Sequence, residues 1–344
     1  MSLLVLSAKD VSAVTSELKP EELEALMASV FHRLSSGSNC ASPHRTSISM
    51  SRHTTLFMPS RVPDLGTTIK VVSVPISEGD KQGLPASTVV LDETTGCVKA
   101  IVNASTLTAL RTASGSVLAT RLLVSKLPKT LLAFGAGQQI NAHVDLHFRA
   151  FPSLESCIIV NRANNTRLQN LLSTLRRSHP FKTFDILTLD DEQLRDAVAK
   201  ADIICTATSS TKPLFSSEWV SPGTHLNLVG SFTPNMHEVD SNLIDRAGKV
   251  VVDSRDACAI EAGELITAGK ADNPKERMIE LGELVEKGED GKYVPIVLPG
   301  GVKGPDGVTI FKSVGVGLQD VAIASLVVSR AKQMGYGTSI DNYH

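Results

Sequence analysis

The 344-residue chain lacks several features that would define its class at once. It contains no run of about 20 apolar residues, the length that a membrane-spanning helix needs, so we expect no contact with a membrane. Its five cysteines are scattered and form no C-x-x-C pair, which argues against a disulfide framework and against a structural zinc site. The apolar start at residues 1–7 has no basic flank, so it predicts a first strand rather than a signal peptide, with the cytoplasm as the default location.

An excess of charge of one sign is missing as well. The chain has 34 Lys and Arg residues against 36 Asp and Glu residues, with no basic run, which makes it a poor candidate for binding nucleic acid. His143 and His147 are four residues apart on an expected helix, but no third ligand is evident, so we expect no metal site. With 42% hydrophobic and 20% charged residues the composition is that of a globular protein, and the length indicates two domains.

Short strand patterns dominate the first third of the chain. The apolar segment 2–6 predicts a strand, and a helix with acidic residues in its first turn is expected after Pro20. Segments bounded by Gly, Pro or Asp predict further strands at 54–58, 68–74, 87–91 and 97–102, followed by a helix over 103–125. These patterns indicate an α+β domain with a mixed or antiparallel sheet.

Beyond Pro128, strands alternate with helices. We expect strands at 130–134, 157–160, 184–187, 202–205, 225–229 and 249–253, and helices at 135–150, 164–177 and 191–200. Such alternation predicts an α/β fold, with a doubly wound parallel sheet of the Rossmann type. The expected first domain spans residues 1–125 and is joined by the C-terminal segment 318–344, which carries a helix over about 318–334. The Rossmann domain spans 126–317 and includes a long Gly- and Pro-rich loop at 287–309.

The segment 134–140, FGAGQQI, follows an apolar strand and opens a helix, which is the setting of the dinucleotide-binding fingerprint. Gly135 allows a tight turn, and Gly137 lets the backbone approach a pyrophosphate held on helix N–H groups. The third fingerprint position holds Ile140 instead of Gly or Ala, a departure that widens the helix–strand contact or shifts the loop. We expect a dinucleotide site here, with Gln138 and Gln139 in the turn.

The end of the second strand of this unit indicates which dinucleotide binds. NAD sites usually carry an acidic residue there, but this strand leads into Asn161 and Arg162, with Arg167 nearby and no carboxylate. The two arginines favour the 2′-phosphate of NADPH, with NADH as the alternative; otherwise they are solvated side chains at a helix start. Residues 206–208, TAT, end another strand at the carboxyl edge of the sheet, where ligands bind, unless they form an ordinary turn.

Basic residues point to an anionic substrate. Residues 25–63 contain four arginines, Arg45 among them, and no acidic residue, which creates a local positive field unless they form a solvated loop. Lys70 lies within an apolar strand, where an edge position facing water is the more common case. Arg111 shares a helix stripe with apolar residues, so it needs a partner: the carboxylate of a ligand or a buried Asp.

Four motifs, in order along nearly the whole chain, resemble those of the ornithine cyclodeaminase/mu-crystallin family. They are residues 110–116 (LRTASGS), 135–139 (GAGQQ), 229–234 (VGSFTP) and 311–315 (FKSVG), the last followed by Gln319 and Asp320. The resemblance implies an N-terminal domain that carries the substrate residues and forms a homodimer, and a Rossmann domain that binds NAD(P).

The resemblance also implies roles for single residues. Arg45, Lys70 and Arg111, the candidate catalytic residues, would contact the carboxylate and the amine or imine of the substrate. The candidate cofactor contacts, from the patterns and the resemblance together, are Gly135, Gly137, Gln138, Gln139, Asn161, Arg162, Arg167, Thr206, Ala207, Thr208, Val314, Gly315 and Thr112.

Members of this family catalyse different reactions: ornithine cyclodeamination, ketimine reduction, alanine dehydrogenation and opine formation or cleavage. The cyclodeaminase uses a Glu before a Met-Pro motif and an Asp in a G-G-D-C-P segment, and Leu56 and Phe232 occupy these two places here. An apolar residue cannot bind a distal amine or move a proton, so ornithine cyclisation is disfavoured. We expect an NADPH-dependent ketimine reductase acting on a small anionic imine; the alternatives are an alanine-type or opine-type amino-acid dehydrogenase and an NADPH-dependent ligand-binding protein.

Overall fold

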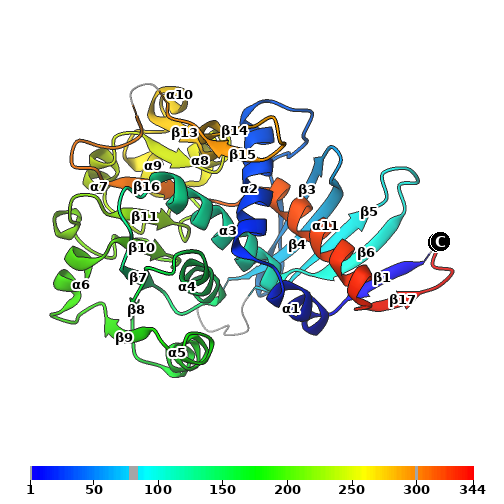
Figure 1. Cartoon of the computed structure of the whole chain (residues 1–344), viewed down its shortest axis with the longest axis horizontal. Helices are drawn as coiled ribbons and strands as arrows, with labels where there is room; N and C mark the ends of the chain where they lie inside the picture. Colours follow the sequence, from blue (N-terminus) through cyan, green and yellow to red (C-terminus); the bar gives the residue numbers. More distant parts are fainter. Residues whose placement is uncertain (1, 77–83, 299–300) are drawn as a thin grey trace. The chain divides into compact units, whose positions relative to one another are not determined.

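The chain forms two compact units, each built on its own sheet (Figure 1). The computed structural model describes residues 2–76, 84–298 and 301–344. Unit 1 comprises residues 1–111 and 315–344, and unit 2 comprises residues 112–314. The division falls inside helix α3 (Ser105–Leu123) instead of after residue 125, and since this helix is continuous, no loop marks the division in the sequence.

Unit 1 contains a seven-stranded mixed sheet in the order β17-β1-β6-β5-β4-β3-β2. β1 and β6 pair in parallel, and the other neighbours are antiparallel. The strands are β1 (Leu3–Leu6), β2 (Thr46–Ser49), β3 (His53–Val62), β4 (Gly66–Pro75), β5 (Ala86–Leu91), β6 (Val98–Asn103) and β17 (Thr338–Ile340). The mixed sheet is the one the strand patterns predicted, while the short exposed strands β2 and β17 carry no apolar alternation and were not expected.

Helices cover one face of this sheet. α11 (Gly317–Met334) packs on β3, β4, β5 and β6 and against α1 (Ala8–Ser16) and α2 (Pro20–Ser35), as Figure 1 shows. The C-terminal helix agrees with the expected helix over about 318–334, and the rest of the segment 318–344 lies beyond it. Gly335, with φ +72°, ends α11 in the left-handed conformation that glycine adopts without strain, and the chain then returns as β17 beside β1.

Unit 2 contains an eight-stranded sheet in the order β13-β12-β16-β11-β10-β7-β8-β9, with every pair parallel. The strands are β7 (Thr130–Phe134), β8 (Ser156–Asn161), β9 (Thr183–Thr188), β10 (Ile203–Thr206), β11 (His225–Leu228), β12 (Val250–Val252), β13 (Met278–Glu280) and β16 (Thr309–Lys312). The strand order reverses between β7 and β10, which in such sheets is the point where ligands bind. The expected loop 287–309 also contains β15 (Tyr293–Pro295), which pairs with β14 (Val285–Lys287).

Helices cover both faces of the sheet of unit 2, which confirms the doubly wound fold. On one face, α6 (Leu194–Lys200), α7 (Ser241–Arg246) and α9 (Gly263–Thr267) share an apolar core with alternate strand residues such as Leu226 and Leu228. His225 and Asn227 alternate with these leucines on β11, and Asn227 donates a hydrogen bond to Thr120 of α3, so they face the other side. α4 (Gln138–Ala150) packs on β7 and β10, and α5 (Thr166–Ser178) packs on α4.

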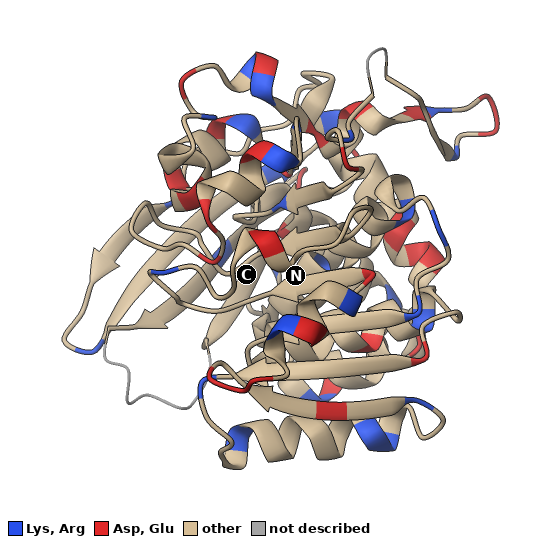
Figure 2. Ribbon diagram, turned by 90° about the vertical axis from the view of Figure 1, so that its left-hand side faces the viewer, with Lys and Arg blue, Asp and Glu red and all other residues tan. Residues whose placement is uncertain are grey.

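Basic and acidic residues are interspersed along the ribbon (Figure 2). Among the described residues, no helix combines the length and the apolar character that a bilayer crossing needs.

Candidate functional site

The glycine turn, residues 135–137, joins β7 to α4 at the carboxyl edge of the sheet in unit 2. Gly135 has φ +118°, and a Cβ atom there would lie 2.9 Å from the Ala207 carbonyl oxygen, so only glycine fits. Gly137 is the N-cap of α4 and has no side chain to cover the first N–H groups of the helix. Ile140 takes the third fingerprint position without opening the packing, because it is fully buried and lies 3.3 Å from that same Cβ position.

Arg167, on the first turn of α5, reaches the glycine turn. Its Nε donates a 2.9 Å hydrogen bond to the Ala136 carbonyl oxygen, and a Cβ atom on Gly137 would lie 2.9 Å from its Nη2. Asn161 ends β8 and donates from Nδ2 to the Ala163 carbonyl oxygen, and Arg162 stands in the exposed loop that follows. The structure therefore brings one of the two predicted arginines onto the turn.

Gln138 and Gln139, which were expected in the turn, follow it and belong to α4. Gln138 is its first residue, and Gln139 accepts a hydrogen bond at its main-chain oxygen from Nδ1 of His143. The side-chain Oε1 of Gln139 is buried and has no hydrogen-bond donor among the described residues. A buried acceptor without a donor is costly, so this atom is one that a bound ligand would satisfy.

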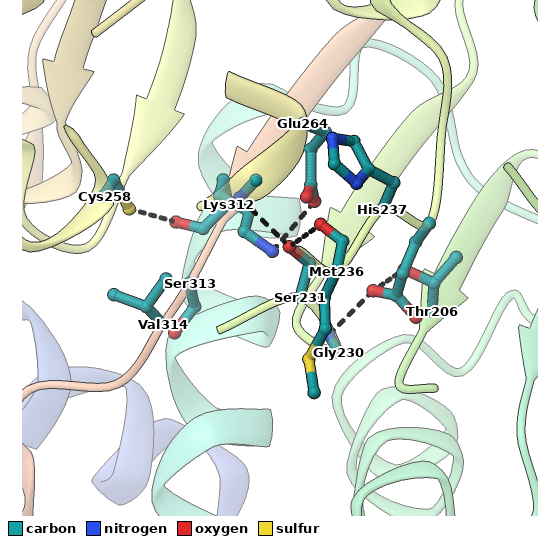
Figure 3. A network of polar contacts seen from close by, with 12 residues as sticks. Thr206, Gly230, Ser231, Met236, His237, Cys258, Glu264, Lys312, Ser313 and Val314 are labelled. Carbon is teal, nitrogen blue, oxygen red and sulfur yellow. Dashed lines mark hydrogen bonds and ion pairs between the residues drawn. The ribbon is translucent and has the colours of Figure 1, made fainter. Parts of the chain in front are cut away.

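Residues 206–208 follow β10 and are held by a buried acid that the sequence gave no reason to select. Glu238 Oε2 accepts from the Thr206 hydroxyl and from the Gly230 N–H, both at 2.7 Å, and Oε1 accepts from the N–H and the hydroxyl of Thr208. Figure 3 shows the Thr206 and Gly230 contacts. Burial raises the pKa of Glu238, and the nearby Glu264 raises it further. Glu238 thus ties the loops after β10 and β11 together at the carboxyl edge.

A second buried pair lies beside it. Lys312 ends β16, and its Nζ lies 2.9 Å from Oε1 of Glu264 on α9, with both side chains fully buried (Figure 3). Asp253, after β12, accepts from the Ser313 hydroxyl at 2.7 Å and from the Val314 N–H at 3.0 Å. These contacts fix Val314, a predicted cofactor residue. We call Glu238, Asp253, Glu264 and Lys312 the acidic network.

Lys70 and Arg111 come together in unit 1. Lys70 lies on β4, an inner strand between β3 and β5, so the expectation of an edge lysine facing water is wrong. Its Nζ lies 2.8 Å from Oδ2 of Asp320, and the Nε of Arg111 lies 3.3 Å from Oδ1 of the same carboxylate. Of the two partners left open for Arg111, a ligand or a buried Asp, the structure supplies the Asp. We call Lys70, Arg111 and Asp320 the cation cluster.

The cation cluster has a strong local field. Burial lowers the pKa of Lys70 from 10.5 to about 8; the Asp320 carboxylate raises it, while the positive charges of Arg111 and Arg45 lower it. Arg45, just before β2, therefore contributes its charge at Lys70. Gly315, with φ +84°, allows a close approach, because a Cβ atom there would lie 2.6 Å from Nη1 of Arg111.

The remaining candidates have ordinary surroundings. Thr112 is buried on α3, in the part of the helix that belongs to unit 2. His143 and His147 are buried on α4, where their Nε2 atoms lie 2.9 and 3.1 Å from the hydroxyls of Ser116 and Thr120. Among the described residues no group of three or more His, Cys, Asp or Glu could hold a metal ion.

The chain is similar to known proteins over most of its length. A model of the ornithine cyclodeaminase/mu-crystallin family matches residues 4–335. Delta(1)-pyrroline-2-carboxylate reductase of Bacillus cereus is 30% identical over 98% of this chain and 100% of its own length, and ketimine reductase mu-crystallin of Mus musculus is 31% identical over 70% and 68%. The structure of Thermococcus litoralis Delta(1)-pyrroline-2-carboxylate reductase in complex with NADH and L-proline has a TM-score of 0.82 and 26% identity, covering 98% of this chain and 100% of that one.

Proposed function

The chain belongs to the ornithine cyclodeaminase/mu-crystallin family, its relatives include a Delta(1)-pyrroline-2-carboxylate reductase and a ketimine reductase, and we propose that it reduces cyclic ketimine carboxylates with NADPH. Δ1-Piperideine-2-carboxylate and Δ1-pyrroline-2-carboxylate are the proposed substrates, and cyclic amino acids are the products. The reaction adds a hydride to the imine carbon and a proton to the imine nitrogen, so the site must hold an anion, a proton and a nicotinamide.

The observation that carries this proposal is the charge balance of the cation cluster. Lys70 and Arg111, 1% and 4% exposed, share the single carboxylate of Asp320. Arg45 adds a further positive charge in the same field. Burying cations is costly unless they are paired, so an excess of positive charge favours a ligand with a carboxylate. An imine acid of the proposed class provides that charge.

The residues of unit 2 fit a dinucleotide. No side chain caps the N-terminus of α4 at Gly137, where helix N–H groups would hold a pyrophosphate, and the buried Gln139 Oε1 is an acceptor that a ligand donor would satisfy. Arg167 presents its guanidinium at the turn, as a 2′-phosphate would require. When bound, NADPH supplies the hydride. Asn161, Arg162 and residues 206–208 complete the proposed nucleotide contacts, with Val314, Gly315 and Thr112.

The side chains of unit 1 then have separate tasks. Arg111 and Arg45 bind the substrate carboxylate, which orients the imine carbon. Lys70 holds a proton on Nζ; it donates a hydrogen bond to the carboxylate or transfers the proton to the imine nitrogen, which leaves a neutral amine and a protonated imine. A protonated imine accepts a hydride more readily than a neutral one, because the nitrogen takes up the electron pair of the C=N bond.

Apolar residues at two positions favour a substrate with no second charge. Leu56 on β3 packs against the apolar cluster of Val72, Ala86 and Ala104 in unit 1, and Phe232 packs against the apolar core of unit 2. Neither could hold the distal amine of ornithine, so cyclodeamination is disfavoured. We further propose that the protein is a cytoplasmic homodimer formed through unit 1, where the edge strand β2 exposes all four of its residues.

One assay tests the proposal. Purified protein is given each cyclic ketimine with NADPH or with NADH, and oxidation is followed by the loss of nicotinamide absorbance. We expect turnover with at least one imine and a lower KM for NADPH. A preference for NADH would overturn the proposed 2′-phosphate contact and leave the reductase standing.

The alternative activities have their own outcomes. Turnover of pyruvate with ammonia, but of neither imine, would favour an alanine-type dehydrogenase, and pyruvate with a second amino acid tests the opine-type reaction. Tight NADPH binding without any turnover would favour a ligand-binding protein.

A further inference from the structure

Asp320 and its neighbour Gln319 form the polar start of α11, and both are buried. Asp320 stands in the first turn, where a carboxylate is stabilised by the N-terminal end of the helix dipole. Its two oxygens face different cations: Oδ2 lies 2.8 Å from Lys70 Nζ, and Oδ1 lies 3.3 Å from Arg111 Nε. One rigid helix start therefore holds side chains from β4 and α3.

Gln319 also holds Arg111, through two hydrogen bonds. Its Oε1 accepts a 2.9 Å hydrogen bond from Arg111 Nη1, and its Nε2 donates a 3.1 Å hydrogen bond to the main-chain oxygen of Arg111. The backbone of Gly315 closes off another direction, since any side chain there would collide with the guanidinium. Arg111 is thus fixed in one orientation.

Lys70 depends on Asp320 more strongly than Arg111 does. A lysine side chain is flexible, and its charge is lost readily when it is buried. The described charges that act on Lys70 are the carboxylate of Asp320 on α11, the guanidinium of Arg111 on α3 and that of Arg45 before β2. Asp320 is the negative one, so it alone among these three favours the ammonium form.

We propose that Asp320 is a positioning residue of the reductase, whose carboxylate fixes the Lys70 ammonium and the Arg111 guanidinium in one geometry. This inference rests on the proposed function, because it concerns how that site presents its cations. Asp320 itself need not touch the substrate, and it acts through the two cations that do.

The test compares Asp320→Asn with Asp320→Glu. Asn keeps the size and one acceptor for Arg111 but removes the charge, so the basic limb of the kcat/KM pH profile should move from about pH 8 toward lower pH by about one unit or more. Turnover at neutral pH should fall about 100-fold, the loss typical of a misplaced substrate. Glu keeps the charge, so its basic limb should stay at the wild-type position although turnover falls.

Asp64→Asn is the matched control. Asp64 is an exposed carboxylate of the same unit with φ +69°, a conformation that Asn adopts readily, so its profile should match the wild type. The dissociation constant for NADPH, measured by nicotinamide fluorescence, should change less than about twofold in every variant and shows that each is folded. An Asp320→Asn enzyme with lower turnover and an unmoved basic limb would overturn the proposal, because a purely structural role gives that result.

Failure of the proposed function is distinguishable from failure of this inference. If the wild type reduces no imine, calorimetric binding of pyrrole-2-carboxylate, a planar cyclic carboxylate, is measured against pH. Affinity should fall as Lys70 loses its proton, and Asp320→Asn should shift that fall to lower pH. An unshifted fall would overturn the role of Asp320 whatever reaction the protein catalyses.

Discussion

The two units bury opposite excesses of charge. The cation cluster of unit 1 places two positive side chains on one carboxylate, whereas the acidic network of unit 2 contains three buried carboxylates and one lysine, Lys312, which pairs with Glu264. The carboxylates of the network are met by the chain itself: Glu238 by Thr206, Thr208 and Gly230, and Asp253 by the N–H groups of Ser254 and Val314. Main-chain and hydroxyl donors therefore satisfy Glu238 and Asp253 and fix loops, whereas Glu264 is met by its ion pair with Lys312.

The positive excess of unit 1 is of another kind. The described ion pairs give Lys70 and Arg111 one carboxylate between them, and the burial of Lys70, with the positive charge of Arg111, lowers the pKa of Lys70. A ligand carboxylate would supply the second negative charge. The comparison indicates that a buried charge is a candidate functional feature when the fold does not supply enough opposite charge or hydrogen-bond partners for it. A buried charge is a structural feature when the backbone supplies those partners.

Acid should give the largest difference in stability between the two units, because unit 2 buries neutral histidines and unit 1 buries none fully among its described residues. Burial lowers the pKa of His143 and His225 to about 4 and that of His147 to about 3. The unfolded chain takes up protons below about pH 6.5 and the folded chain does not, so stability is full above that pH and is lost as the pH falls toward 4. By pH 5 the loss should reach about 2 kcal/mol per histidine.

Urea unfolding at pH 7.5, 6 and 5 measures this loss, with His147→Asn as the comparison. That variant removes one titrating group, so its stability should fall less steeply below about pH 6.5 than that of the wild type. Equal slopes would show that His147 does not contribute to the acid sensitivity.

Breaking the acidic network should have the next largest effect. Lys312→Met leaves Glu264 buried without its cation, which should lower the free energy of unfolding by about 3–5 kcal/mol. Adding Glu264→Leu removes the orphaned charge and should recover most of that loss. Lys70→Met is the matched change in unit 1, and it should cost much less, because Asp320 retains Arg111. Denaturant titrations of the three variants check this, and an equal loss for Lys312→Met and Lys70→Met would contradict the comparison.

Arg111→Ala tests the cation cluster through activity. Removing the guanidinium should lower kcat/KM for the imine about 100-fold, or about 3 kcal/mol, chiefly through a higher KM. Arg330→Ala is the control, since Arg330 pairs with Glu22 at the surface of the same unit and should leave the KM unchanged. If turnover and KM were both unchanged in Arg111→Ala, the carboxylate role would be wrong.

The sequence predicted the features that depend on local periodicity. The glycine turn, the doubly wound sheet and the mixed sheet followed from apolar spacing and turn residues, and all are present. β16 was not predicted, because its apolar run is only Ile310 and Phe311 before the charge of Lys312 ends it. β2 was not predicted either, since all its residues are exposed.

Local sequence patterns could not predict which residues pair with the charged candidates. Arg111 and Asp320 are 209 residues apart, and no spacing rule connects them before the chain is folded. The alternation along β4 did place Lys70 on one face of its strand, yet it could not show that β4 is an inner strand and that the lysine is covered. Burial of a polar residue depends on which element packs over it, and here that element is α11, from the far end of the chain.

The smallest predicted effect concerns Arg162 and Arg167, the two arginines of the proposed nucleotide site in unit 2. Arg167 is held by the Ala136 carbonyl at the glycine turn, whereas Arg162 stands in the exposed loop after β8. A fixed guanidinium loses less entropy on binding a phosphate, so Arg167→Ala should reduce the preference for NADPH over NADH about 10-fold and Arg162→Ala should reduce it less. The ratio of kcat/KM for the two cofactors measures this preference, and KM for NADH should stay constant because NADH carries no 2′-phosphate. The larger effect at Arg162 would place the phosphate on the loop instead of the turn, and no effect at either would remove the reason to favour NADPH.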